Sequence, residues 1–503
     1  MSMPCPPRTF YDENRHKCDY IGNIRVFSFS FWNRHIKMYL GLLVVAIFAV
    51  GSLGQKFNRF CHYNSWSLSR NPEHGLIPED IDPFLCTHII LGFAEIDETG
   101  LRLKDPNHYQ QEYLYQRIVR LRRINPRLNM ILSVGGWDKS QEGYSKLVSS
   151  RENILFFTKW IITYLRRHDF DGLDLDWEYP TFKGSPMADR KKFVDLVENL
   201  AYEFDIEEIP DIKWKLTLTW TADPLEPIRT SAYDIKGIAS KVHFVNLKMY
   251  DFHGHWDDPL QVNHHSPLTN PSSPRNVNEL AKTWVKAGVR IEKLILGIPF
   301  FGRSFTLKTA NMSMPGSPAV GPGSDYGDGI PIHNLCHIIR GGTKELYLPE
   351  KKVPYIVSGS EWIGYDNPRS VMEKAQLVFN NALAGVMIYS LDMDDHRGTC
   401  GQKYPMMMAV IHGLNAYMEY IDSKHKSLEL TYNKKILRAR VSLRNYRRRN
   451  QPDKVAEVQQ RIRQIEQEQQ QAMGNMVYER QQAQAMLNRG VSLPPIEQQS
   501  WSW

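Results

Sequence analysis

Cysteine is scarce in this chain, with six residues among 503. Six cysteines cannot be the main source of stability in a chain of this length, so any disulfides are local staples on a packed core. Length alone suggests about three domains, but large α/β barrels depart from that rule. Hydrophobic residues make up 42% of the chain and charged residues 23%, which excludes a wholly disordered, collagen-like or small disulfide-stabilised protein.

An excess of positive charge is missing from the central part of the chain, although the whole chain carries +7. Residues 430–503 hold 13 Lys plus Arg against 6 Asp plus Glu, and residues 1–37 hold 6 against 3. The residues between these ends therefore carry a net charge of −3. A slightly acidic body between basic ends argues against nucleic acid as a partner of the body.

Charge is also absent from residues 38–55, where the run MYLGLLVVAIFAVGSLG is apolar enough to enter a bilayer. Its length is at the lower limit for a spanning helix and slightly above that of a signal-peptide core, so it predicts a signal peptide or a signal-anchor helix. Basic residues before the run (Arg25, Arg34 and Lys37) favour a segment, residues 1–37, that is cytoplasmic or removed. Both interpretations export everything after residue 55.

The two interpretations differ in the fate of the apolar run after export. A first strand is expected from about Arg59, which would leave almost no linker to a bilayer, so we favour cleavage between Ala49 and Gly54 and a secreted, extracellular, monomeric protein. The alternative is a type II single-pass membrane protein with its folded body outside, the one case in which we expect contact with a membrane. Four cysteines and the sequon Asn311-Met312-Ser313 come after the apolar run, in agreement with export.

The tail, residues 423–503, changes composition from a basic run (Arg438 to Arg449) to a Gln-rich segment (Val455 to Asn488). Four residues have a 3-4-3 spacing that covers less than two heptads, too little to indicate a coiled coil: Val455, Val458, Ile462 and Ile465. We expect a solvated helix or disorder.

Short apolar and β-branched runs recur along residues 56–422, with helical stretches such as Ile154–Arg167 and Lys192–Phe204 between them. Alternating strands and helices indicate a parallel sheet covered by helices, and eight strands predict a closed α/β barrel of the (β/α)8 TIM type. The gap between the last two strands is too long for one helix, so a small α+β insertion is expected at about residues 301–369. The predicted strands are Arg59–Trp66, Cys86–Phe93, Leu128–Val134, Gly172–Glu178, Lys215–Trp220, His243–Tyr250, Lys293–Pro299 and Ala384–Leu391.

Acidic side chains alternate along the fourth predicted strand, in the segment FDGLDLDWEYP at residues 170–180. On an extended strand Asp174, Asp176 and Glu178 share one face, while the leucines and the tryptophan between them face the helices. Active groups of such barrels lie at the carboxyl ends of the strands. Confined like charges raise one another's pKa, so at least one group should hold a proton near neutrality, and the acid at the strand end is best placed to donate it.

Other interpretations of these acids are less favourable. A calcium loop needs oxygen ligands on a turn with a glycine at its sixth position, whereas the alternate residues here demand a buried strand. A site for another divalent metal lacks a nearby pair of histidines. Acids on an exposed strand would be ordinary, but their apolar neighbours argue against full exposure. We therefore favour catalysis.

The segment DGLDLDWEYP resembles the D-x-x-D-x-D-x-E signature of family 18 glycoside hydrolases, the chitinases and chitinase-like lectins. The resemblance extends from about residue 58 to residue 415. SVGGW at Ser133–Trp137 is similar to the family's third-strand motif, and NLKMYDFHGHW at Asn246–Trp256 is similar to its sixth-strand motif. GRSF at Gly302–Phe305 and DMDD at Asp392–Asp395 also fit.

The resemblance implies a retaining hydrolase that uses substrate assistance in place of a protein nucleophile. Glu178 would protonate the glycosidic oxygen and later activate water, while the N-acetyl oxygen of the substrate attacks the anomeric carbon. Asp176 would orient the acetamide and stabilise the oxazolinium cation, Asp174 would tune Asp176, and Tyr250 would donate a hydrogen bond to the acetamide carbonyl. Only 2-acetamido sugars supply that nucleophile, so the expected substrate is chitin or a chito-oligosaccharide, with no cofactor and no metal.

The resemblance also implies where the substrate binds and where disulfides form. Asp251 would help to bind the distorted sugar, and flat rings at strand ends would stack on pyranose faces. The other residues expected to contact the substrate are Trp66, Trp137, Tyr389, Arg303, Phe93 and Asp171. The expected disulfides join Cys61 with Cys86 and Cys336 with Cys400.

The sequence departs from the family pattern at four positions. Lys248 stands where the family usually has methionine, and the strand parity that it shares with Tyr250 turns it towards the acids. A buried ammonium group there would favour the ionised form of Asp176 or Glu178, which is unfavourable for a proton donor. The other departures are Tyr389 in place of a tryptophan, Phe301 in place of a tyrosine and His62 in place of an aromatic residue.

The residues are compatible with two classes of function. The first is an exported chitinase that hydrolyses β-1,4-N-acetylglucosamine linkages, and the second is a chitinase-like lectin that binds chito-oligosaccharides with weak or no hydrolysis. Lectin-like relatives often lack the acid, and Glu178 is present here, which favours the enzyme.

Overall fold

The computed structural model describes residues 9–12, 17–20, 57–70, 75–104, 108–137, 141–209, 214–324 and 329–488. The chain divides into two compact units, residues 1–56 and 57–503. In the first unit, β1 (Thr9–Asp12) and β2 (Lys17–Tyr20) pair antiparallel. The predicted signal or anchor segment at residues 38–55 lies outside the described residues. Within the described part, no helix has both the length and the apolar character needed to cross a membrane.

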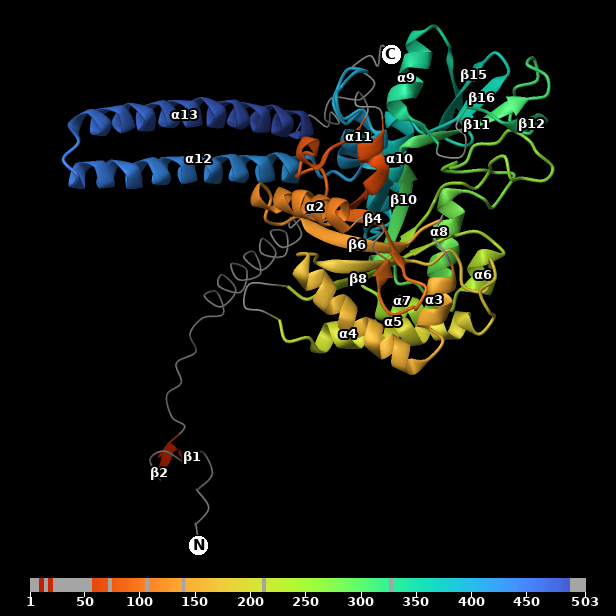
Figure 1. Ribbon diagram of the computed structural model, residues 1–503, viewed down its shortest axis with the longest axis horizontal. Coiled ribbons are helices and arrows are strands. Elements are labelled where there is room, and N and C mark those ends of the chain that lie inside the picture. The colour runs from red at the N-terminus through yellow and green to blue at the C-terminus, as the bar shows by residue number, and fades with distance from the viewer. Residues whose placement is uncertain are drawn as a thin grey trace. The chain divides into compact units, whose positions relative to one another are not determined.

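Parallel strands of the second unit close into a barrel (Figure 1). Strand β3 pairs with β17 on one side and with β4 on the other, which closes the sheet. Each barrel strand overlaps one of the predicted runs, so the predicted (β/α)8 TIM barrel is confirmed. In chain order the barrel strands are β3 (Asn58–Asn64), β4 (His88–Ile96), β6 (Asn129–Gly135), β7 (Gly172–Asp176), β8 (Thr217–Ala222), β9 (Phe244–Leu247), β10 (Leu294–Pro299) and β17 (Gly385–Tyr389).

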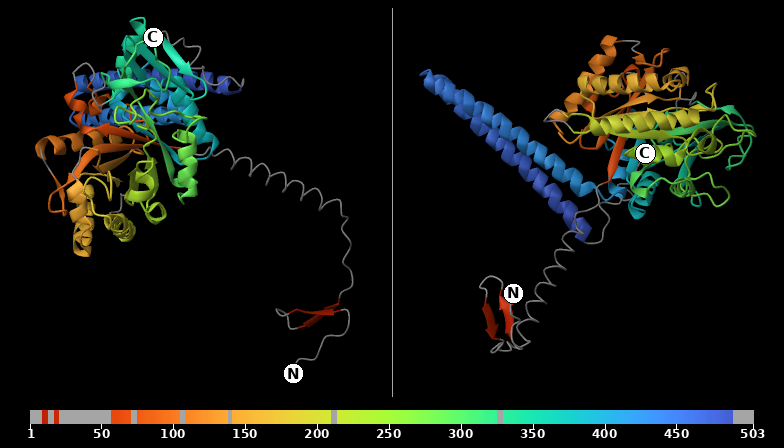
Figure 2. Two further views of the ribbon diagram at one scale, coloured as in Figure 1. Left: turned by 90° about the vertical axis from the view of Figure 1, so that its right-hand side faces the viewer. Right: turned by 90° about the horizontal axis from the view of Figure 1, so that it is seen from below.

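Helices cover the outside of the barrel (Figure 2). In α4 (Arg151–Arg167) the side chain of Ser150 caps the first turn by accepting a hydrogen bond from the backbone N–H of Asn153. The apolar residues of α4 recur every three or four positions, and the side that packs on the barrel is buried. The other covering helices are α2 (His108–Val119), α3 (Gln141–Leu147), α5 (Asp189–Ile206), α6 (Ile228–Ala232), α7 (Ile235–Lys241), α8 (Val277–Lys286), α10 (Pro368–Asn380) and α11 (Pro405–Gly413).

The predicted α+β insertion between the seventh and eighth barrel strands is confirmed. Its antiparallel sheet has the strand order β12-β11-β16-β15-β14, and β13 pairs with β11. A separate core fills it, which includes Phe305, Tyr355 and Trp362. The elements of the insertion are β11 (Phe301–Leu307), β12 (Ala319–Pro322), β13 (Ile330–Pro331), α9 (Ile332–Arg340), β14 (Glu345–Leu348), β15 (Val353–Ser358) and β16 (Glu361–Gly364).

Both expected disulfides are present. Cys61 of β3 is bonded to Cys86, just before β4, with their Cα atoms 6.1 Å apart. Cys336 of α9 is bonded to Cys400, with a Cα separation of 6.2 Å. The first bond staples two neighbouring barrel strands, and the second ties the insertion to the loop after β17.

The tail is helical, which is one of the two outcomes expected, but two paired helices take the place of a single solvated helix. It forms two long helices, α12 (Tyr417–Arg448) and α13 (Pro452–Asn488), that lie side by side (Figures 1 and 2). Ile436 and Ala439 of α12 are buried in this pair, as is Ile462 of α13. The apolar spacing in α13 has its partner in α12, so neither helix alone contains the complete pattern.

The helix pair contacts the barrel near the start of α12. The ammonium group of Lys424 lies 2.7 Å from Asp82 Oδ2, and Tyr420 donates a hydrogen bond to the same oxygen at 3.0 Å. Ser427 donates to the backbone carbonyl of Ile124 at 2.7 Å. These contacts hold the first turns of α12 on the barrel.

Candidate active site

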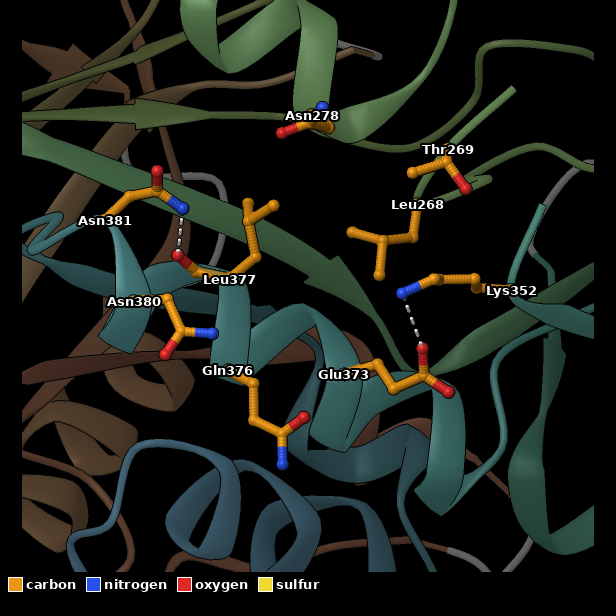
Figure 3. A pocket seen from close by; sticks show the side chains of 9 residues that line it. All are labelled: Leu268, Thr269, Asn278, Lys352, Glu373, Gln376, Leu377, Asn380 and Asn381. Carbon is orange, nitrogen blue, oxygen red and sulfur yellow. Dashed lines mark hydrogen bonds and ion pairs between the residues drawn. The ribbon is translucent and has the colours of Figure 1, made fainter. Parts of the chain in front are cut away.

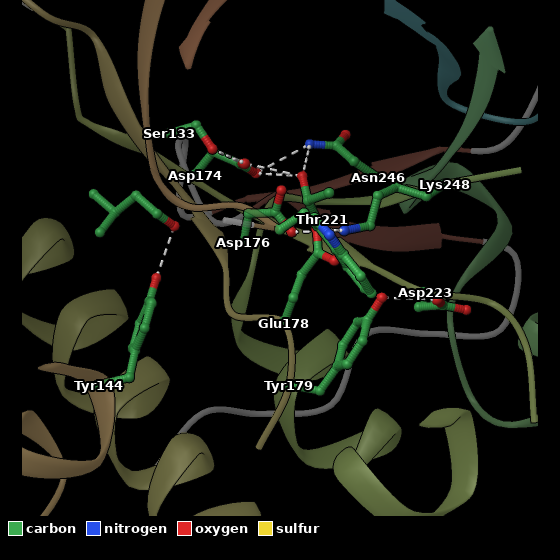
Figure 4. Close-up of polar contacts among 12 residues, drawn as sticks. Ser133, Tyr144, Asp174, Asp176, Glu178, Tyr179, Thr221, Asp223, Asn246 and Lys248 are labelled. Carbon is green, nitrogen blue, oxygen red and sulfur yellow. Dashed lines mark hydrogen bonds and ion pairs between the residues drawn. The ribbon is translucent and has the colours of Figure 1, made fainter. Parts of the chain in front are cut away.

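The carboxylate strand β7 runs through the centre of the candidate site (Figure 4). Its five residues are all buried, and acidic and apolar side chains alternate along it as predicted. Leu173, Leu175 and Trp177 are buried on the helix side, where Trp177 stacks on Tyr144 with ring centroids 4.7 Å apart. The other parity directs Asp174, Asp176 and Glu178 to the barrel interior and its carboxyl end.

Asp174 lies deepest and accepts hydrogen bonds from three neighbouring strands. Ser133 Oγ of β6 donates to it at 2.8 Å, and Thr219 and Thr221 of β8 donate at 2.5 Å and 2.9 Å. The side-chain amide of Asn246 on β9 adds a bond of 3.2 Å. Burial raises the pKa of Asp174, and these donors oppose the rise because they stabilise the carboxylate.

Lys248 bridges the two outer acids. It comes directly after β9, with the same parity as Asn246, so its side chain points into the barrel. Its Nζ lies 2.9 Å from Oδ1 of Asp176 and also contacts Oε1 of Glu178. Burial alone would lower the pKa of Lys248, but the two carboxylates outweigh burial and raise it. The ammonium group is therefore charged and neutralises part of the acid cluster.

The pKa of Asp176 is well above its usual value because the group is buried. Lys248 opposes this rise, whereas the neighbouring charge of Glu178 adds to it. A divalent cation between Asp176 and Glu178 would have to displace the ammonium group that already bridges their oxygens.

The glycine-rich end of β6 lets the carboxylate strand approach closely. Gly135 has a φ of 111°, and a Cβ atom there would lie 2.1 Å from the backbone oxygen of Asp176. At Gly136, also with positive φ, a Cβ atom would meet the ring of Phe93 at 3.0 Å. A larger residue at Gly135 would force β6 away from β7, and one at Gly136 would press on Phe93 of β4, which explains the SVGG sequence physically.

Sequence reasoning missed a further acid at this end of the barrel. Asp223 comes directly after β8 and accepts a hydrogen bond of 3.0 Å from the hydroxyl of Tyr179, the residue after Glu178. Burial raises the pKa of Asp223 to about 6. Its place directly after the strand was a usable signal, because carboxyl ends of barrel strands collect the functional side chains.

Asp251 and Arg303 form a two-point ion pair beside the acids. Arg303 Nε lies 2.8 Å from Oδ1 of Asp251, and Nη2 lies 2.9 Å from Oδ2. Burial would raise the pKa of Asp251, but the guanidinium group outweighs it and holds that pKa below its usual range. The pair links the end of β9 to the first strand of the insertion.

Aromatic rings continue from the acids towards the surface. Tyr250 and Tyr389 have ring centroids 5.7 Å apart, and Tyr389 lies 5.2 Å from the ring of His62. His62 is followed by Phe93 at 5.7 Å and Phe93 by Trp66 at 6.0 Å. Trp66 lies in the short helix η1 (Ser65–Ser69) and is 41% exposed, so the series of rings reaches solvent.

Trp137 and Trp256 are exposed at the same end of the barrel. Trp137 is 64% exposed, and the ammonium group of Lys183 lies 3.6 Å from its ring centroid. Trp256 lies near the guanidinium group of Arg303, whose Cζ is 5.5 Å from the indole ring. Exposed flat rings beside a polar cluster are suited to stacking on sugar faces.

The structure does not bring Asp171 to this group. It immediately precedes β7 and so lies at the amino end of that strand, opposite to Glu178. Its carboxylate accepts hydrogen bonds from the backbone N–H of Met130 at 2.8 Å and from Arg122 at 3.1 Å. Asp171 therefore ties β7 to β6 and to a nearby arginine, which corrects the expectation that it contacts substrate.

A hollow is lined by residues of α8 and α10 (Figure 3). An ion pair of 3.3 Å between Lys352 and Glu373 borders it, and the leucines Leu268 and Leu377 contribute apolar surface. None of the predicted site residues is among the residues that line it. Its lone ion pair and amide side chains offer no pair of acids for general acid–base chemistry.

Residues 58–394 match the family described as "Glycosyl hydrolases family 18". The chain therefore belongs to that family. It is 92% identical over 466 residues to "Putative chitinase" of Pinctada maxima, which covers 93% of this chain and 100% of that protein. It is 35% identical over 392 residues to "Chitinase-3-like protein 2" of Homo sapiens, which covers 75% of this chain and 97% of that protein.

Solved structures agree with this assignment. The chain is 35% identical to human YKL-39, described as a pseudo-chitinase with retained chitooligosaccharide binding properties, with a TM-score of 0.66 over 72% of this chain and 100% of that chain. It is 28% identical to the Group IV chitinase of Ostrinia furnacalis, with a TM-score of 0.67 over 72% and 100%. The protein is thus a family 18 chitinase or chitinase-like protein.

Proposed function

We propose that this protein hydrolyses the β-1,4 linkages between N-acetylglucosamine units of chitin or chito-oligosaccharides and retains the anomeric configuration. The observation that carries the proposal is the alignment of Asp174, Asp176 and Glu178 along one face of β7, with Glu178 last. The signature acid is present and its carboxylate contacts Lys248, whereas Asp174 is fixed by hydrogen bonds from four side chains.

The reaction would divide its steps among these residues. Glu178 donates a proton to the glycosidic oxygen as the substrate's acetamide oxygen attacks the anomeric carbon, and then removes a proton from the attacking water. Asp176 holds the acetamide nitrogen and offsets the positive charge of the oxazolinium ion, and Asp174 behind it adds negative charge. Tyr250 donates to the acetamide oxygen, and the rings of Tyr389 and Trp66 stack on successive sugars.

Lys248 restrains this reaction. The ammonium group is held between the carboxylates of Asp176 and Glu178, and the acid has to leave this contact before it can reach the glycosidic oxygen. The acetamide of a bound sugar also competes with Lys248 for Asp176. We therefore expect slow hydrolysis, with a rate that depends on the ammonium group leaving the two acids.

A second candidate is a chitinase-like lectin that binds chito-oligosaccharides without turnover. The same bridge of Lys248 to Asp176 and Glu178 favours it, because the bridge holds the acid away from a glycosidic oxygen. Human YKL-39, whose description names retained binding in a pseudo-chitinase, offers a precedent among the similar structures.

A defined N-acetylglucosamine hexamer separates the two candidates. Purified protein is incubated with the hexamer, products are measured by chromatography, and binding is measured by calorimetry on the same sample. Release of shorter oligomers that is lost in Glu178→Gln supports the hydrolase. Binding without any release in the parent protein supports the lectin and contradicts the primary proposal.

We propose in addition that the barrel is exported as a monomer. The Cys61–Cys86 and Cys336–Cys400 disulfides support this, since such bonds persist in oxidising compartments. Expression of the full chain in animal cells, with detection of the barrel in medium and in cell extract, tests export. Sedimentation of the purified protein tests the monomer.

A further inference from the structure

The turn between α12 and α13 is the most basic surface of the described chain. Residues 434–463 contain eleven Lys and Arg against two acidic residues, Asp453 and Glu457. Eight of the eleven lie between Lys434 and Arg449, and the others are Lys454, Arg461 and Arg463. All eleven side chains are exposed. We call this surface, residues 434–463, the basic tip.

The pairing of the two helices explains why the charges face outwards. On α12, Ile436, Ala439, Leu443 and Tyr446 have a 3-4-3 spacing and are the less exposed positions. The same spacing and lower exposure are found on α13 at Val455, Val458, Ile462 and Ile465. These two rows face each other, so the cations occupy the remaining positions on every outer side.

The basic tip has little internal neutralisation. Within the described residues, one of the eleven cations forms an ion pair. This is Arg440, which lies 3.2 Å from Glu466. Lys454 lies 5.4 Å from the ring centroid of Tyr446, a contact that leaves its charge in place. Repulsion among so many like charges destabilises the two helices. An anionic ligand would reduce this repulsion.

The basic tip also lies far along the helices from the barrel. Ser427 of α12 makes a hydrogen bond to the barrel, and Arg448 is 21 residues further along the helix, or about 30 Å at 1.5 Å per helical residue. That exceeds the Debye length of about 8 Å at physiological salt, so the acidic body does not neutralise the tip. The charges are available to a partner.

We propose that the basic tip binds an acidic polysaccharide through its sulfate or carboxylate groups. Eight of the eleven cations are arginines, whose planar guanidinium groups bind such oxyanions in a two-point manner. The cations surround both helices, which suits a flexible linear polymer that can wrap along them and is poorly matched to a flat bilayer. Tyr446 is the sole aromatic residue from 434 to 463 and lies in the helix seam, so the tip lacks rings for stacking on nucleobases.

This binding is independent of the proposed barrel chemistry. Together with that chemistry, which rests on the proposed function, it would place a neutral polysaccharide on the barrel and an acidic one on the helix pair. The Glu178→Gln protein is expected to bind acidic polysaccharide like the parent, so failure of the hydrolase proposal and failure of this one are distinguishable.

The test uses the full chain on surfaces that carry dextran sulfate, polygalacturonate or neutral dextran. We expect binding to both charged polymers, weakened by salt, and none to neutral dextran. Charge reversal of Arg444, Arg447, Arg448 and Arg449 to Glu should weaken binding at least about tenfold. The matched control reverses four exposed cations of the barrel, Arg127, Arg151, Lys191 and Lys236, and should change it less than about twofold.

Four further results decide the proposal. Circular dichroism should show unchanged helix content in the tip variant, and replacement of the same four arginines by Gln should give a smaller loss of binding in the same direction. Equal loss in the tip variant and in the control would overturn the proposal, because net charge alone would then explain binding. Tighter binding to duplex DNA or to vesicles of phosphatidylserine than to either polysaccharide would also overturn it.

Discussion

Lys248 Nζ lies 2.9 Å from Asp176 Oδ1 and at the same time contacts the carboxylate of Glu178. One ammonium group thus serves two acids that a family 18 hydrolase uses for different steps. The contact stabilises the cluster in the absence of sugar, because buried carboxylates without a counter-ion are costly. It also occupies the two carboxylates that would contact a bound sugar, so the same contact stabilises the site and restrains it.

Replacement of Lys248 by Met should release this restraint. Without the ammonium group, the carboxylates of Asp176 and Glu178 no longer have to leave an ion pair before they contact a bound sugar, so turnover of the hexamer should rise by about tenfold, which corresponds to about 1.4 kcal/mol of barrier. Lys248→Arg keeps the charge and should keep the parent rate. An unchanged rate in Lys248→Met would show that Lys248 is not an electrostatic brake.

Replacement of Glu178 by Gln should remove hydrolysis and keep binding. Gln cannot donate a proton, and loss of a general acid costs about 10²- to 10⁴-fold in rate. The hexamer should still bind within a few fold of the parent affinity, because the aromatic rings and Asp251 are unchanged. Calorimetry and product analysis on one preparation check both expectations. Parent-like turnover in this variant would assign proton transfer to another residue.

Replacement of Arg303 by Gln should destabilise the fold and weaken sugar binding together. It leaves the carboxylate of Asp251 without its two-point partner, and loss of one member of a buried pair costs about 3–5 kcal/mol. Asp251 is 32% exposed, so we expect a smaller loss, about 2 kcal/mol in the free energy of unfolding. Arg290→Gln, at a residue that is 66% exposed beside Glu292, is the control and should cost less than about 0.5 kcal/mol. Equal losses in urea unfolding would contradict the assignment.

His62 predicts how stability depends on pH. Burial, with the charge of Lys248 added, lowers the pKa of His62 from 6.5 to about 3. Between these values the unfolded chain binds a proton that the folded protein does not, so the free energy of unfolding falls as pH falls from 6.5 towards 3. At pH 5 this effect lowers the free energy of unfolding by about 2 kcal/mol.

His62→Phe should remove that part of the pH dependence and flatten the profile below pH 6.5. Replacement of the exposed His337 by Phe is the control and should keep the parent slope. Urea unfolding of the three proteins at pH 5 and pH 7 measures the difference. Parallel profiles for the parent and His62→Phe would mean that His62 is protonated in the folded protein.

The barrel and the carboxylate strand were predictable because burial of both faces of a parallel strand leaves a clear sequence pattern. Strand parity alone predicted that the side chain of Lys248 faces the acids, and the structure confirms this. The helix pair of the tail was not predictable in this way, since the seam of α13 is complete only when Ile436 and Ala439 of α12 face it.

Asp171 shows a different limit. It belongs to the signature by sequence, but it precedes β7 by one residue, and in a parallel barrel this places it at the end opposite to the reacting groups. Asp223, outside every motif, is at the reacting end because it comes directly after β8. Position relative to the strand end was therefore more informative than membership of a motif.

The anomeric configuration of the first product is the most direct test of substrate-assisted hydrolysis with Glu178 as the acid. The Lys248→Met protein and the parent are mixed with the N-acetylglucosamine hexamer, and proton NMR records the anomeric signals before mutarotation. We expect the new reducing ends to appear as the β-anomer, faster in Lys248→Met than in the parent and absent in Glu178→Gln. Initial formation of the α-anomer, or no cleavage by either the parent or Lys248→Met while the hexamer binds, would contradict this expectation.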